Sequence, residues 1–186
     1  DNAYESRNQL THVVIGAFVN SIGAHAFEDC ANLQKVTFTG SVASNGTTIG
    51  NYAFYNCTAL STIVFEDDCD VVSIGQYAFA FCDHLEQIDI PMTLTAISSY
   101  AFSNCSALSS ITIAGGEEEL QIQDYAFNEC ENLATVTLEA SVGDFNFLRS
   151  FDGCTGIEHV FVSDANISFD YDAGVVFYKA FTEILS

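Results

Sequence analysis

The sequence predicts an α/β solenoid, in which short structural repeats stack and their strands form one parallel sheet. The first observation is that six Cys recur at intervals of 23 to 27 residues: Cys30, Cys57, Cys82, Cys105, Cys130 and Cys154. The second is that each of these Cys stands in the same order of apolar residues. The third is that a unit this short cannot bury its own apolar face, so neighbouring units must complete the core.

The five complete copies begin with Ile, which Gly follows in the first three, and continue through Ala-Phe, Cys and Leu to two alternating apolar residues. The first copy reads IGAHAFEDCANLQKVTF. The copies cover residues 22–38, 49–65, 74–90, 97–113, 122–138 and, in a degenerate form, 150–162. Leu10, Val13 and Ile15 match the second half of a unit, so the pattern starts before the first complete copy.

The two halves of a copy carry different periodicities. In the Ala-Phe-x-x-Cys-x-x-Leu half, apolar residues are three and four positions apart, which is typical of a short helix or 3₁₀ turn. In the Leu-x-x-Ile-x-Ile half, the last two apolar residues alternate with an outward position, which indicates a short strand with one buried face. A linker of variable length and a turn, which is Ile-Gly in the first three copies, join one strand to the next copy.

Stacking these units gives a right-handed solenoid with a parallel concave sheet and with short helices or 3₁₀ turns on its convex side. We expect a single domain over residues 1–186, made of about six to seven repeats. The two ends must differ from the interior, because they cover a core that would otherwise be exposed. Residues 1–21 are therefore predicted to be an N-terminal half-repeat or cap, and residues 166–186 a C-terminal cap.

This repeat resembles the BspA-like (Treponema-type) leucine-rich repeats, whose signature is Ile-Gly-x-x-Ala-Phe-x-x-Cys-x-x-Leu-x-x-Ile-x-Ile. Ser-Val steps at residues 41–42 and 141–142 follow the strands as they do in that family. Residues 171–179, YDAGVVFYK, look like the Asp-Gly-Val-Leu-(Phe/Tyr)-x-Lys segment that often follows its repeats. The resemblance covers roughly residues 10 to 180. It implies a surface protein that binds host or matrix components.

The charge balance narrows the range of partners. The net charge is −21, from 25 acidic residues against 4 Lys and Arg. Such a surface repels phosphate backbones and anionic lipids, so we expect neither nucleic acid binding nor direct membrane insertion. Two interpretations of this acidity remain open. Either it keeps the proteins of the source organism soluble in general, or it attracts cations and basic proteins.

The sequence contains no segment that could anchor it in a membrane as a helix, since no apolar run reaches the roughly 20 residues that span a bilayer. The chain starts without Met, so we expect any export signal or anchor to lie outside it.

The outward positions of the predicted strands form the candidate binding surface. One column lies between the last two apolar residues of each copy, and the other lies just before the first of these two. The predicted ligand-binding residues are Lys35, Thr37, Thr62, Val64, Gln87, Asp89, Ser110, Thr112, Thr135, Thr137, His159 and Phe161. Two interpretations remain open. Thr suits any exposed strand position, whereas a mostly neutral face on an acidic protein favours recognition of a protein or glycan.

Cysteine and acidic residues have simpler interpretations. The repeated Cys are predicted to be a column of buried thiols, because a column offers no unique disulfide pairing. Cys69 lies outside this column within the acidic segment 66–70, so we expect an exposed thiol whose pKa the neighbouring carboxylates raise. No Cys-x-x-Cys or His-x-x-x-His pair indicates zinc. The acidic loop 117–119 lacks the ligand spacing of an EF-hand.

The sequence therefore predicts a binding protein without catalytic activity, cofactor or resident metal. His12, His25, His84 and His159 stand in separate repeats, with no triad-like partner beside them. The leading hypothesis is a monomeric, extracellular or cell-surface adhesion module that recognises a protein or glycan through the concave sheet. The alternative is a structural spacer of a larger surface protein, whose acidic surface confers solubility and weak calcium binding.

Overall fold

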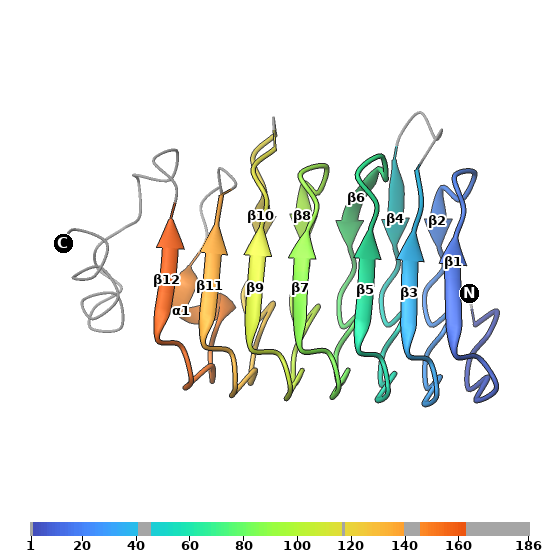
Figure 1. The fold of residues 1–186 in the computed structure, drawn as a ribbon, viewed down its shortest axis with the longest axis horizontal. Helices are drawn as coiled ribbons and strands as arrows, with labels where there is room; N and C mark the ends of the chain where they lie inside the picture. Colours follow the sequence, from blue (N-terminus) through green and yellow to red (C-terminus); the bar gives the residue numbers. More distant parts are fainter. Residues whose placement is uncertain (1, 41–45, 117, 140–145, 163–186) are drawn as a thin grey trace.

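A computed structural model describes residues 2–40, 46–116, 118–139 and 146–162 of the chain. These residues form a parallel β-solenoid, in which each turn passes through one strand of a front row and returns behind it (Figure 1). The solenoid predicted from the repeat pattern is thus confirmed. The predicted C-terminal cap, residues 166–186, lies outside the described residues.

The front row contains the strands that the alternating half of each copy predicts. They are β1 (His12–Ile15), β3 (Lys35–Phe38), β5 (Thr62–Phe65), β7 (Gln87–Ile90), β9 (Ser110–Ile113), β11 (Thr135–Leu138) and β12 (His159–Val162). All ladders in the row are parallel, and the strands that pair do so at equivalent positions of the repeat. The alternation buries one face, since Val36 and Phe38 of β3 are at most 1% exposed. We call the outward surface of this row the strand face.

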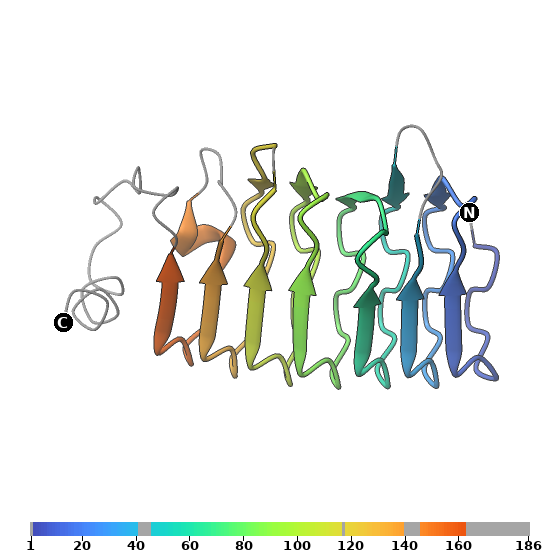
Figure 2. The same cartoon turned by 45° about the horizontal axis from the view of Figure 1, so that its top comes forward.

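The front row is divided between β5 and β7. The row consists of one sheet of β1, β3 and β5 and a second sheet of β7, β9, β11 and β12. Figures 1 and 2 show a wider gap between β5 and β7 than between the other neighbours. The core is less well covered beside it, because Ile63 is 9% exposed whereas its counterparts Ile88 and Ile111 are 1% exposed. The single continuous sheet expected from the repeats is therefore two sheets on this side.

A further sheet, which the sequence pattern did not predict, runs continuously along the back. Its strands are β2 (Ser21–Ile22), β4 (Thr47–Ile49), β6 (Val71–Ile74), β8 (Ala96–Ile97) and β10 (Gln121–Ile122). Each strand ends at the Ile that begins a copy, so this Ile closes a strand where the turn begins. Strands as short as two residues leave no alternation to detect. This back sheet bridges the gap between β5 and β7.

The Ala-Phe-x-x-Cys half of each copy forms consecutive turns rather than the short helices or 3₁₀ turns that its spacing indicated. In residues 23–30, His25 and Asp29 have left-handed φ angles of 58°. Their N–H groups donate to Asn51 and Tyr55 of the next turn at 3.0 and 2.9 Å, instead of closing a helix. Turns and helices place apolar residues at the same spacing, and inter-turn bonding decides between them. The described ranges contain one helix, α1 (Phe147–Ser150), in the degenerate sixth copy.

A stack of phenylalanine rings fills the centre of the solenoid. Phe54 and Phe79, both fully buried, stack with their ring centroids 5.0 Å apart and their planes 2° from parallel. The stack contains Tyr4, Phe27, Phe54, Phe79, Phe102, Phe127 and Phe151. Because Tyr4 occupies the Phe position, the N-terminal segment is a further turn of the same kind. Its Asn2 and Tyr4 N–H groups donate to Ala24 and Ala26.

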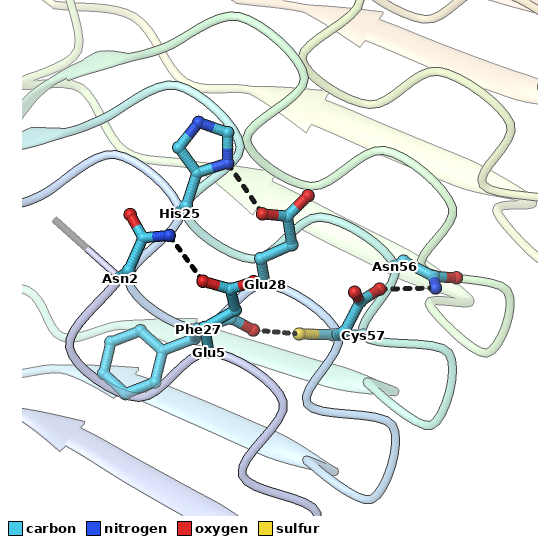
Figure 3. Close-up of polar contacts among 8 residues, drawn as sticks. Asn2, Glu5, His25, Phe27, Glu28, Asn56 and Cys57 are labelled. Carbon is cyan, nitrogen blue, oxygen red and sulfur yellow. Dashed lines mark hydrogen bonds and ion pairs between the residues drawn. The ribbon is translucent and has the colours of Figure 1, made fainter.

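The repeated Cys lie beside these rings as free thiols, five of them buried and Cys154 half-buried. Figure 3 shows the thiol of Cys57 directed at the carbonyl oxygen of Phe27, on the interior side of the turn. Cys69 is a correction to the sequence prediction: it is only 3% exposed and packs in the core. Its pKa is raised, mainly by burial and further by the neighbouring carboxylates. The acidic residues on either side turn outward, so the polar sequence around Cys69 concealed its burial.

Candidate binding surface

The ladders of the front row place the predicted binding residues in two columns. In the larger sheet, Asp89, Thr112, Thr137 and Phe161 stand side by side on successive strands. Gln87, Ser110, Thr135 and His159 form the second column of this sheet. Because adjacent parallel strands lie about 4.8 Å apart, equivalent side chains repeat at that spacing. The repeat register alone therefore assembles these eight residues into one patch.

The other four predicted residues form a smaller patch on the far side of the gap. Lys35 pairs with Thr62, and Thr37 pairs with Val64, in the sheet of β1, β3 and β5. No ladder connects this sheet with β7. The structure thus brings the twelve residues onto one face, but it divides them into a patch of four and a patch of eight.

The strand face is accessible and close to neutral in charge. Gln87, Asp89 and Thr62 are exposed, and the Thr and Ser residues of β9 and β11 are half-buried by their neighbours. Only Lys35 and Asp89 among the predicted residues carry formal charges, and these are of opposite sign. The net charge of −21 is therefore concentrated elsewhere. A hydroxyl-rich, neutral sheet is a surface that can donate and accept hydrogen bonds without the desolvation cost of charged groups.

Aromatic and apolar side chains mark the two ends of the outer column. Phe161 is 49% exposed, and its ring lies 6.2 Å from the ring of His159 at an interplanar angle of 22°. Val14, the equivalent residue of β1, is 67% exposed. Aromatic rings contribute much of the binding energy in protein interfaces. The C-terminal end of the strand face therefore exposes an aromatic ring of this kind.

His25 and His84 form hydrogen bonds within the solenoid, each in a different turn. The Nδ1 atom of His25 lies 2.7 Å from a carboxylate oxygen of Glu28, on the outer side of its turn (Figure 3). The Nδ1–H of His84 donates to the carbonyl oxygen of Thr58 at 2.6 Å. Within the described residues, no group of three His, Cys, Asp or Glu side chains is arranged to hold a metal ion. No helix in those residues is long and apolar enough to cross a bilayer.

Sequence reasoning missed one surface feature, a column of tyrosines on the turn side of the solenoid. The residue before each Ala-Phe pair is His25, Tyr52, Tyr77, Tyr100 or Tyr125. Their rings stack from turn to turn, with neighbouring centroids 4.8 to 5.2 Å apart. Listing that variable position down the repeats would have revealed the column. Only the structure shows that the rings contact each other.

The fold and its surface define the class of the protein as a leucine-rich-repeat solenoid with an accessible parallel strand face. The sequence profile of the BspA type leucine rich repeat region matches residues 1–114 and 47–177. The chain therefore belongs to the BspA-type leucine-rich-repeat family, as the resemblance of its repeat predicted. No curated protein matches the chain significantly in sequence.

Solved structures of bacterial leucine-rich-repeat proteins share the fold. The Treponema pallidum leucine rich repeat protein is 26% identical, with a TM-score of 0.63 over 83% of this chain and 73% of its own. A leucine rich cell surface protein from Faecalibacterium prausnitzii is also 26% identical, with a TM-score of 0.55 over 89% of this chain. The pneumococcal vaccine antigen PcpA is 21% identical, with a TM-score of 0.63 over 84% of this chain. This chain spans only 36% and 41% of the length of the last two proteins.

Proposed function

We propose that this chain is a monomeric recognition module of an extracellular or cell-surface protein, which binds a protein or glycan through the strand face. The observation that carries the proposal is the neutrality of that face on a protein with a net charge of −21. Depletion of charge in an accessible patch is a property of interface cores. The patch of eight residues on β7, β9, β11 and β12 is the primary site, with Phe161 as its aromatic anchor. The patch around Lys35 and Thr62 extends it.

The surroundings of the face support this role. The side chains of Thr112 and Thr137 stand on paired strands, so little backbone freedom is lost when a ligand binds. The strong negative charge opposes self-association and favours a monomer. The Faecalibacterium protein of the same fold and 26% identity is described as a cell surface protein, which supports the proposed location of this one.

The proposal is tested by direct binding of the purified chain to a panel of matrix glycoproteins and glycans at physiological salt, with and without Ca²⁺. Thr112→Arg combined with Thr137→Arg places two bulky charges in the centre of the patch. The matched control is Thr48→Arg with Ser73→Arg, which adds the same charge to neighbouring positions of the back sheet. We expect saturable binding that the front pair weakens by about tenfold or more, or about 1.4 kcal/mol, and that the back pair preserves.

Binding that is insensitive to the front pair, or no binding to any member of the panel, would favour the structural spacer instead. In that case the acidic surface would serve solubility, with Ca²⁺ bound weakly or not at all. A spacer also tolerates Phe161→Ala without loss of any partner, whereas a recognition module does not.

A further inference from the structure

The tyrosine column on the turn side has the properties of a second interaction surface. We define the Tyr ladder as the stacked rings of His25, Tyr52, Tyr77, Tyr100 and Tyr125. Neighbouring planes lie within 14° of parallel. All five residues are half-buried. The turn segments that carry them run behind the front row, so the ladder and the strand face lie on different sides of the solenoid (Figures 1 and 2).

Two further aromatic residues widen the ladder over its middle turns. The ring of Tyr55 meets that of Tyr52 edge to face at 5.4 Å, and Phe81 meets Tyr55 in the same way at 5.4 Å. Both are half-buried. Aromatic rings at this density on an accessible surface are typical of interface hot spots, because they bury much apolar area with few rotatable bonds.

The tyrosine hydroxyls of the ladder have no hydrogen-bond partner in the part of the chain that the structure describes. Among the described residues, none of the hydroxyls of Tyr52, Tyr77, Tyr100 and Tyr125 bonds to another protein group. No buried side-chain oxygen in those residues lacks a partner, so these hydroxyls reach solvent. The pKa of Tyr77 is raised, first by burial and then by the nearby hydroxyls of Tyr100 and Tyr52. The hydroxyls thus form a close row of donors and acceptors.

Charge is absent from the middle of the ladder and negative at both ends. The segments 51–56, 76–81 and 99–104 contain no charged residue. At the N-terminal end, Glu28 and Asp29 bond to His25 and Asn56, which carry no permanent positive charge. Both carboxylates lie close enough to raise the pKa of Tyr55, after the larger effect of its burial.

The C-terminal end has one negative charge in excess, because two carboxylates face one cation there. It carries Asp124 and the exposed Glu129. Asp124 forms an ion pair with Arg149 at 3.0 Å, which leaves the charge of Glu129 uncompensated by that contact. Both ends of the ladder therefore favour positively charged groups.

This arrangement limits what can bind there. Saccharides stack on ring faces, but each ladder ring covers the faces of its neighbours and leaves only edges and hydroxyls open. A second copy of the chain is disfavoured, because it has only 4 basic residues against 25 acidic ones. We propose that the Tyr ladder binds an extended peptide segment of a protein partner, uncharged in its middle and basic at both ends.

The repeat spacing sets the length of that segment. Glu28 and Glu129 are equivalent to within one position and lie four turns apart, a span of about 19 Å at 4.8 Å per turn. An extended peptide rises about 3.3 Å per residue, so the two basic groups stand about six positions apart, with roughly five uncharged residues between them. The partner's uncharged stretch lies across the hydroxyl row, and its basic ends meet the carboxylates.

Two peptides of identical composition test the proposal by isothermal titration calorimetry with the unmodified chain. One has two Arg at each end and about five uncharged residues between them, to match the span of the ladder. The other has all four Arg at one end, so general attraction to an acidic protein is the same for both. We expect the first peptide to bind at least about tenfold more tightly. Equal affinities, or no measurable binding of either peptide, would overturn the proposal.

Charge-neutral variants then locate the site. Tyr77→Ser with Tyr100→Ser should abolish the preference for the first peptide. Tyr77→Phe with Tyr100→Phe keeps the rings stacked and removes only the hydroxyls, so it should weaken binding by a smaller factor. Thr112→Ala with Thr137→Ala on the strand face should leave the peptide affinity unchanged. A preference that survives both tyrosine variants, or that disappears with the threonine variant, would exclude the ladder as the site.

Discussion

The thiol of Cys57 donates a hydrogen bond to the carbonyl oxygen of Phe27, one turn earlier, at 3.2 Å. The same oxygen accepts the N–H of Cys30 at 3.3 Å, so it is shared between its own turn and the next. The contact recurs from Cys82 to Phe54 at 3.5 Å. Cys therefore has two roles at this position: it fills a buried site of small volume, and it links each turn to the one before.

Replacing one of these thiols in the interior should destabilise the solenoid. Cys82→Ala removes the bond to Phe54 and leaves a small cavity at a fully buried position, so we expect a loss of about 1–3 kcal/mol of unfolding free energy. Cys154→Ala serves as the comparison, because its site is only half-buried. Urea unfolding followed by circular dichroism measures both. An equal loss for the two variants would contradict the importance of burial here.

The buried thiols also predict lower stability at alkaline pH. Burial raises the pKa of Cys57 and Cys82 well above the ordinary thiol value. Above about pH 8.5 the unfolded chain loses these protons while the folded chain keeps them. Stability is therefore fully present below that pH and falls as the pH rises, by about 1.4 kcal/mol per pH unit for each thiol.

Urea titrations at about pH 7, 9 and 9.5 measure this slope. Below about pH 10 the tyrosines contribute little, because their ordinary pKa lies there. The double variant Cys57→Ala with Cys82→Ala should show a shallower decline than the native chain. A decline of the same steepness in both proteins would show that other groups cause it.

Gly50 should tolerate no side chain at the point where its turn meets the preceding one. A Cβ atom at Gly50 would lie 2.7 Å from the carbonyl oxygen of Ile22 and 2.8 Å from the backbone nitrogen of Ala24. Because backbone atoms cannot move aside cheaply, we expect Gly50→Ala to cost about 1–3 kcal/mol. Gly16→Ala is the matched control: nothing lies within 4 Å of its added carbon. The control should stay within about 0.5 kcal/mol of the native chain.

His84 should be replaceable by Asn but not by Ala. At the equivalent position, the side-chain amides of Asn32 and Asn132 donate to the preceding turn at 2.7 Å, to Asn8 and Ser106. His84 makes the same bond to Thr58 beside the gap in the front row. We therefore expect His84→Asn to preserve the melting temperature and His84→Ala to lose about 0.5–1.5 kcal/mol. A catalytic or metal-binding role for His84 would instead leave stability indifferent to both changes.

Much of the fold followed from the sequence because each repeat satisfies the same local rules. The alternation of Val36 and Phe38 predicted β3, and its recurrence predicted the entire front row. The turns were predicted as helical because Ala26, Phe27 and Cys30 have a spacing that both structures share. The acceptors of the backbone N–H groups distinguish turns from helices. The N–H of Phe27 donates to the carbonyl oxygen of Ala53 in the next turn, and this bond forms only when the turns stack.

The candidate surfaces, too, were predictable from the sequence only in part. The columns of Thr112 and Thr137 could be drawn from the sequence, because side chains alternate along a strand. Their division into two patches could not, since the gap between β5 and β7 depends on how whole turns pack. The burial of Cys69 was equally inaccessible, because its immediate neighbours in sequence are acidic and only the folded chain places it in the apolar core.

The sequence by itself determined the repeat, the strands and the residues that face outward, because these depend on periodicities within about 20 residues. It also determined the family, through the residues that every copy repeats. Tertiary structure alone decided the back sheet, the gap in the front row, the thiol bonds between turns and the contact of Tyr77 with Tyr100. These features are interactions between turns, and their free energy comes from groups some 25 residues apart that meet only when the solenoid is stacked.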